Sequence, residues 1–165
     1  MKRQVVVFRI GNEEFAVDIL ATKEVVGRPR VTPVPETAEY VEGVMNLRGS
    51  LIPVLDLRKR LRAQGSKERT DERVIISIIE EKTIGLIVDG TSEVLRITND
   101  EIEEVPDVIS EIGASYIEGI IAWSGRHIAL IDLNKALSGE VLCELDEVMS
   151  AILKGRAREN PVTAA

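Results

Sequence analysis

The sequence has few aromatic residues, one cysteine and no long apolar run. Only 3% of its 165 residues are aromatic although 44% are hydrophobic. The core must therefore be built from Val, Ile and Leu, which favour β-strands where they cluster. The single cysteine, Cys143, excludes an internal disulfide and a cysteine-ligated zinc site, and it indicates a reducing compartment. Because no apolar run approaches about 20 residues and no signal segment opens the chain, we expect a cytoplasmic protein without direct membrane insertion.

Basic residues are outnumbered by acidic ones. The formal net charge is -7 and the pI is about 4.9, so the chain repels phosphate backbones and we expect no nucleic-acid partner. The one basic run, residues 58–62, follows Asp56 and lies near the end of an expected short helix. We interpret this run as a solvated face that offsets the helix dipole.

Signatures of catalysis are also missing. The sequence contains no GxxxxGK[ST], GxGxxG, HExxH, CxxC or GxSxG motif, and His127 is its single histidine. Asp56 and Asp132 each precede a short leucine-initiated segment and are explained as helix N-caps. Asp18 and Asp89 end apolar segments, and we expect them at strand ends facing water. The sequence therefore predicts a protein that is not an enzyme and that has no cofactor and no metal site.

What the sequence does contain is an internal repeat. Residues 40–57 recur as residues 116–133 at a constant spacing of 76, as from Tyr40 to Tyr116. Seven positions are identical: Tyr40/Tyr116, Glu42/Glu118, Gly43/Gly119, Gly49/Gly125, Ile52/Ile128, Asp56/Asp132 and Leu57/Leu133. An earlier hairpin over residues 5–19 also has a second copy, at a spacing of 69, as from Val5 to Val74. The chain thus holds two copies of one unit.

Each copy reads as several short strands separated by glycine-containing turns, which predicts a mainly β fold of two small barrels around a pseudo-twofold axis. We expect one domain over 1–155 with a shared core, divided into subdomain one at about 15–72 and subdomain two at about 73–140. The N-terminal strand and a helix over 140–154 should pack on both, and residues 156–165 should form a flexible tail.

The chain resembles the CheW coupling proteins of bacterial chemotaxis. The matching motifs are residues 15–19 with Glu24 and Val25, residues 31–35, residues 43–49 running into 52–57, and residues 85–90. This resemblance covers residues 4–140 and implies five-stranded SH3-like barrels in a non-enzymatic adaptor. Such an adaptor would join the regulatory domain of the histidine kinase CheA to the cytoplasmic tips of chemoreceptors, in receptor arrays at the inner membrane.

The resemblance also implies site residues. By position, receptor contact falls on Thr22, Glu24, Gly43, Arg48 and Val74, and kinase contact falls near Val108 in the second barrel. The family often has a bulky aromatic or a basic residue in that second segment, whereas this chain has Val108 preceded by acidic residues.

One expectation comes from the residues themselves, and a second combines the residues with what the resemblance implies about a receptor. Arg48, at a strand reversal beside an apolar seam, needs a carboxylate partner, and Glu24 is the best-placed candidate for a structural ion pair. Val25 and Val74 are expected to line an apolar groove between the barrels, which receives a helical receptor tip.

Two other functions remain open. The chain could be a paralogous adaptor of a chemosensory-like pathway that does not control motility. It could also be a small-molecule enzyme or ligand-binding β-barrel, and a deep polar pocket with converging titratable groups would favour this alternative. A dry apolar groove between the barrels would favour the adaptor.

Overall fold

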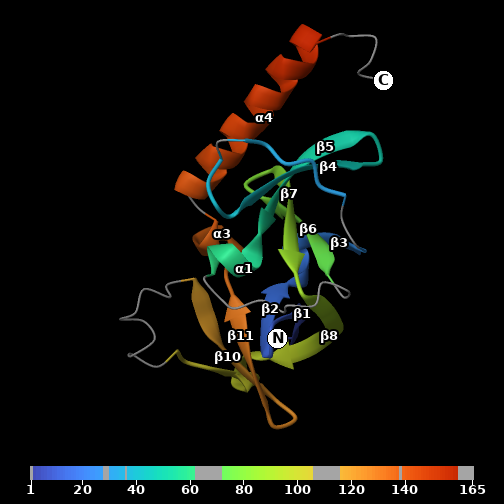
Figure 1. Cartoon of the computed structure of the whole chain (residues 1–165). Helices are drawn as coiled ribbons and strands as arrows, with labels where there is room; N and C mark the ends of the chain where they lie inside the picture. The colour runs from blue at the N-terminus through green and yellow to red at the C-terminus, as the bar shows by residue number, and fades with distance from the viewer. Residues whose placement is uncertain are drawn as a thin grey trace.

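The computed structural model describes residues 2–27, 30–35, 37–61, 72–105, 116–137 and 139–159, with no side-chain detail at position 92 or beyond position 152. Within these ranges the chain forms two β-sheets, short helical turns and one long helix (Figure 1). No helix in the described part of the chain is long and apolar enough to cross a membrane. The prediction of a mainly β fold is confirmed.

The first sheet has six strands in the order β8-β1-β2-β11-β10-β9. Its strands are β1 (Lys2–Ile10), β2 (Glu13–Asp18), β8 (Gly90–Thr98), β9 (Ile102–Glu103), β10 (Ile117–Trp123) and β11 (Arg126–Ile131). All neighbouring strands are antiparallel except β2 and β11, which run parallel. A 3₁₀ turn, η2 (Asn99–Glu101), joins β8 to β9 and begins with a capping box between Thr98 and Glu101.

The second sheet has five strands in the order β3-β6-β7-β5-β4. Its strands are β3 (Thr22–Val26), β4 (Val41–Leu47), β5 (Ser50–Asp56), β6 (Arg73–Ile79) and β7 (Lys82–Val88). Here β5 and β7 form the parallel pair. An isolated bridge between Thr32 and Val44 takes the place that the two-residue strand β9 has in the first sheet. The expected five-stranded barrels are thus two sheets of six and five strands, consistent with SH3-like subdomains.

The two copies of the repeat exchange strands. The hairpin β1-β2 of the first copy pairs with β10-β11 of the second, and β6-β7 of the second copy pairs with β4-β5 of the first. A division at residues 72 and 73 therefore does not separate the sheets. The sequence pattern of a hairpin does not show which other hairpin will complete its sheet. The division of the chain into two sheets is therefore decided only by the tertiary pairing of β2 with β11 and of β7 with β5.

The core has three parts. One lies within the six-stranded sheet around Val5, Ile121 and Leu130, and another lies within the five-stranded sheet around Val54, Val74 and Ile76. The largest cluster takes side chains from both sheets and from the C-terminal helix; it includes Phe8, Phe15, Leu55, Leu57, Ile75, Leu86, Leu133 and Leu145. The two sheets therefore share a core, which consists almost entirely of aliphatic side chains.

Helices cover and connect the sheets. As predicted, Asp56 and Asp132 cap α1 (Leu57–Arg60) and α3 (Leu133–Ala136). Figure 1 shows α4 (Glu140–Glu159) passing β4 and β5 and extending beyond them. This helix continues through Gly155 and past the expected end at 154, because one glycine costs a helix only about 1 kcal/mol. Cys143 is exposed on α4, although a lone cysteine at this position of an apolar helix was expected to be a buried side chain.

Candidate functional site

Arg48 and Glu24 form the expected ion pair. Arg48 lies in the β4-β5 reversal at φ 50°, and its Nη1 donates to Glu24 Oε2 at 2.8 Å while Nη2 donates to Oε1. The hydrogen bond from Arg48 lowers the pKa of Glu24, and the same bond raises the pKa of Arg48. Because β3 and β4 are the opposite edges of the five-stranded sheet, this pair joins the two edges of the curled sheet.

The six-stranded sheet has a counterpart that the sequence reasoning missed. Arg126 donates to Glu14 at 2.9 and 2.8 Å and to Glu93 at 2.6 Å, which links the β10-β11 reversal to edge strand β8. Glu93 is the repeat equivalent of Glu24, 69 residues later, and Ser124 takes the place of Arg48 at φ 47°. The sequence signal for this second link was Glu93, which repeats Glu24. Its arginine partner, Arg126, lies two residues after Ser124, the position equivalent to Arg48.

Two of the expected receptor contacts are buried. Val74 has 0% exposed surface inside the five-stranded sheet. Gly43 is also buried, at φ 143°, where an added Cβ would lie 2.0 Å from the Thr32 carbonyl oxygen. Neither residue presents a side chain to solvent, and the expected receptor contact at Gly43 and Val74 stays a prediction.

Two further expected receptor contacts lie on edge strand β3. Thr22 is half-buried at the end of the 3₁₀ turn η1 (Ile19–Ala21), and Glu24 is half-buried. Edge strands also carry apolar surface, from Val25 on β3, which is 39% exposed, and from its repeat equivalent Val94 on β8, which is 51% exposed. Val108 lies outside the described residues, so the structure says nothing of the expected kinase contact.

One residue of the expected solvated basic run, Arg58, lies instead in a buried charge cluster, while Lys59 is exposed as expected. Arg58 is 6% exposed, and it donates to both carboxylate oxygens of Asp56 at 2.8 Å and to Asp89 at 2.7 Å. Its fourth contact is Glu72 at 3.3 Å. Hydrogen bonding to Asp56 is the largest influence that raises the pKa of Arg58. Asp89 is buried as well, contrary to the expectation that it faces water, because it accepts from Gly11 N at 2.6 Å as well as from Arg58.

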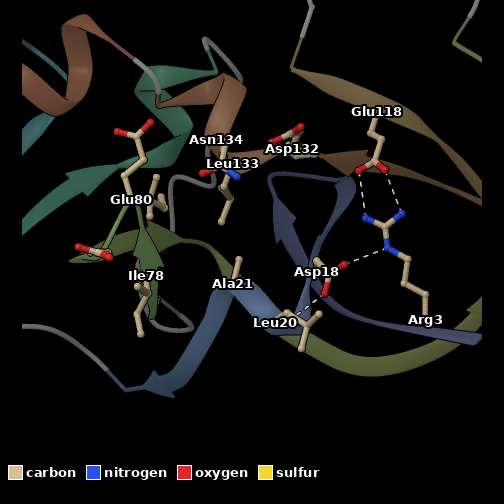
Figure 2. Close-up of a pocket in the computed structure, with 13 residues that line it drawn as sticks. Arg3, Asp18, Leu20, Ala21, Ile78, Glu80, Glu118, Asp132, Leu133 and Asn134 are labelled. Atoms are coloured by element: carbon tan, nitrogen blue, oxygen red, sulfur yellow. Dashed lines mark hydrogen bonds and ion pairs between the residues drawn. The ribbon is translucent and has the colours of Figure 1, made fainter.

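A pocket of about 520 Å³ opens between the two sheets (Figure 2). It is bounded by η1, the β6-β7 reversal, β1, β10 and α3. On one side, Arg3 bridges Asp18 at 2.9 Å and Glu118 at 2.9 and 3.1 Å, as the dashed lines of Figure 2 show. His127 is exposed on β11 and is not among the lining residues. In the described residues, no group of three or more His, Cys, Asp or Glu side chains could hold a metal ion.

The fold and these surfaces define a small, duplicated β-sheet module that exposes apolar side chains at its sheet edges. Residues 4–141 match the family model of the CheW-like domain. The chain therefore belongs to the CheW family, as the motifs indicated.

Relatives of known name support this assignment over most of the chain. The sequence is 34% identical over 146 residues to chemotaxis protein CheW of Klebsiella aerogenes, with 88% of each chain covered. It is 33% identical over 138 residues to chemotaxis protein CheW of Rhizobium meliloti, covering 84% of this chain and 89% of that protein. The crystal structure of the scaffolding protein TtCheW from Thermoanaerobacter tengcongensis matches with a TM-score of 0.76 and 36% identity, covering 86% of this chain and 96% of that one. The chain is thus a CheW scaffold or adaptor of chemotaxis.

Proposed function

We propose that the chain couples chemoreceptors to the histidine kinase CheA, with a helical receptor tip docking at the edge strands β3 and β8. The observation that carries this proposal is an exposed aliphatic side chain, Val25, on an edge strand whose neighbouring residue, Glu24, is held by an arginine. Edge strands with apolar side chains are sites of association unless something covers them.

The surface suits an amphipathic helix. Val25 and Val94 supply apolar area from equivalent positions of the two sheets, and Thr22 and Glu24 are polar residues of the same edge strand as Val25. Apolar side chains at helical spacing on a partner can pack on such area, while polar residues fix their register. The exposed Arg48, with 70% of its side-chain surface free, can also reach a partner while it keeps Glu24 in position.

Gly43 and Val74 support the surface from behind. Val74 is the register partner of Val26 on β3, so it sets the path of that edge strand. Gly43 allows the Thr32 backbone to approach β4, since any Cβ there would overlap the carbonyl. Substitutions at both positions should impair binding through the shape of the five-stranded sheet.

The kinase would be engaged elsewhere. We place its regulatory domain at the segment around Val108, where the family resemblance puts a contact in the second barrel. Binding to both partners would recruit the chain to receptor arrays at the inner membrane, without insertion of its own. Neither a nucleic acid nor a small-molecule cofactor has a part in this proposal.

The test is co-sedimentation of the protein with a receptor cytoplasmic fragment and, separately, with CheA. The variant Val25→Asp should weaken receptor binding by at least about tenfold, because burying an unpaired carboxylate costs more than about 1–3 kcal/mol. Its melting temperature and CheA binding should stay unchanged, since Val25 is already exposed.

Two controls make the result specific. Ser150→Asp places the same charge at an exposed position of α4, outside β3 and β8, and should leave receptor binding intact. Val74→Asp should unfold the protein and abolish both interactions. Full receptor binding by Val25→Asp, or loss of CheA binding together with it, would rule out the proposed surface.

A further inference from the structure

The junction between the two sheets has two ends that the repeat relates to each other. A spacing of 76 residues carries Asp56 to Asp132 and Arg58 to Asn134, and a spacing of 69 carries Leu20 to Asp89. Residues that surround the buried Arg58 at one end thus have equivalents that line the pocket of Figure 2 at the other.

At the closed end, a guanidinium fills the space. Arg58 projects from α1 and contacts Asp56, Asp89 and Glu72, and only 7% of its side chain remains exposed. Asp89 also accepts from the backbone nitrogen of Gly11, so the β1-β2 reversal is fastened to this cluster.

At the open end, the position equivalent to Arg58 does not hold an arginine. Its place on α3 is taken by Asn134, a much shorter side chain, and the place of Asp89 is taken by Leu20. Leu20 is 90% exposed and Ile78 is 47% exposed, both at the rim of the pocket, as Figure 2 shows. The space that a guanidinium fills at the closed end is therefore part of a pocket of about 520 Å³ with an apolar rim.

The charge of the open end favours a cationic occupant. Among the described residues, five carboxylates line it: Asp18, Glu80, Glu81, Glu118 and Asp132. The one basic side chain in this described lining, Arg3, is engaged with Asp18 and Glu118. Asp132 has the backbone conformation of Asp56, with φ and ψ of -88° and 104° against -90° and 105°, so the carboxylate that binds arginine at the closed end has a half-exposed counterpart on the same backbone conformation.

We propose that this pocket docks a segment of a partner protein that presents an arginine next to an aliphatic side chain. The guanidinium occupies the position that Arg58 has at the closed end and binds the carboxylate of Asp132. The aliphatic side chain packs on Leu20 and Ile78. Arginine is favoured over lysine because its planar fork engages both oxygens of one carboxylate, as Arg58 does with Asp56. The lining of the pocket does not include Thr22, Glu24, Val25 or Val94, the residues of the proposed receptor surface.

The test is a titration of ¹⁵N-labelled protein with the dipeptide N-acetyl-leucyl-arginine amide, followed by amide chemical shifts. Shifts should concentrate at Leu20, Ala21, Ile78, Glu118 and Asn134. The matching dipeptide with citrulline, which keeps the shape but loses the charge, should bind at least about tenfold more weakly, since a hydrogen bond to a charged group is worth more than a neutral one.

The decisive variant is Asn134→Arg, which should fill the pocket from within, as Arg58 fills the closed end. It should bind the arginine dipeptide at least about tenfold more weakly than the natural sequence. Asn12→Arg adds the same charge at an exposed position outside the pocket and should bind normally. If Asn134→Arg fails to fold, Leu20→Ser removes the exposed aliphatic rim instead and should also weaken binding.

Three results would overturn the proposal. Equal shifts with the citrulline dipeptide would show that charge has no part in binding. Undiminished binding by Asn134→Arg or, should that variant not fold, by Leu20→Ser would place the arginine elsewhere. Concentration-dependent dimerisation of the natural sequence, abolished by Asn134→Arg in sedimentation experiments, would assign the pocket to a second copy of this chain.

Discussion

The two ends of the sheet junction are related by the internal repeat and have opposite character. At one end Arg58 is buried among Asp56, Asp89 and Glu72, so charges of the chain satisfy each other. At the other end Asn134 leaves an open pocket with an exposed Leu20 at its rim. A duplicated fold can thus keep one copy of a site for internal cohesion while the other copy becomes available to a partner.

The largest effect in this comparison should come from Arg58→Ala. Removing the guanidinium leaves Asp56 and Asp89 buried, at 2% and 5% exposure, without their cation. Breaking a buried charge cluster in this way costs about 3–5 kcal/mol, and the loss should appear as a lower urea midpoint with an unchanged slope. Asn134→Ala, the matched change at the open end, should alter stability by less than about 0.5 kcal/mol. Equal effects of the two variants would show that the ends do not differ as described.

A smaller loss should separate the two equivalent glycines of β4 and β10. Gly43→Ala forces a Cβ to within 2.0 Å of a backbone oxygen at a positive φ, whereas Gly119→Ala meets first the Ile102 side chain at 2.5 Å, which can move. We expect about 1–3 kcal/mol of strain for Gly43→Ala and less for Gly119→Ala, measured by thermal unfolding of both variants. The reverse order would contradict the close approach of Thr32 to β4.

The Arg48–Glu24 and Arg126–Glu93 pairs should differ in their effect on receptor affinity. Double-mutant cycles of Arg48→Ala with Glu24→Ala, and of Arg126→Ala with Glu93→Ala, would measure the coupling within each pair. We expect a small coupling in melting temperature for both pairs, and a coupling in receptor affinity for Arg48 with Glu24. Additive losses of receptor affinity for Arg48→Ala and Glu24→Ala would mean that the two residues act independently there.

The smallest expected effect is a pH dependence of the Arg48–Glu24 pair. Since Arg48 lowers the pKa of Glu24 in the folded protein, the stabilisation is present above the ordinary glutamate pKa of 4.5. It should disappear as the pH falls below that value and through the lowered folded pKa. The difference in urea midpoint between the natural sequence and Glu24→Gln should therefore shrink on acidification from about pH 7 to about pH 3. A difference that is constant over this range would show that the charge of Glu24 does not contribute.

Much of the fold was predictable because the relevant signals are local. Aliphatic alternation placed the strands, the aspartates at 56 and 132 marked the starts of two short helices, and the repeat spacing showed the duplication. The Arg48–Glu24 pair was also predictable from the sequence, because an arginine in a reversal beside apolar strands needs a nearby carboxylate to pair with its charge.

The interior and exterior positions of particular residues were less predictable. Val74 and Val25 are both valines in apolar strands, yet one is fully buried and the other is on the surface. The difference follows from the face of the sheet on which each side chain falls, which depends on strand pairing. Asp89 and Arg58 were expected in water for a similar reason, since neither sequence context shows that the two would meet inside the protein.

The sequence by itself determined the strand-rich composition, the two helix caps, the two copies of the unit and the family to which they belong. These features depend on residue types and on spacings along one chain. Only the tertiary structure decided that the copies exchange hairpins, that Arg58 is buried while Asn134 leaves a pocket, and that Arg126 repeats the link made by Arg48. Each of these features depends on contacts between segments far apart in the chain. Because equivalent segments of the repeat have similar sequences, the local sequence does not show which of two equivalent segments a strand will pair with.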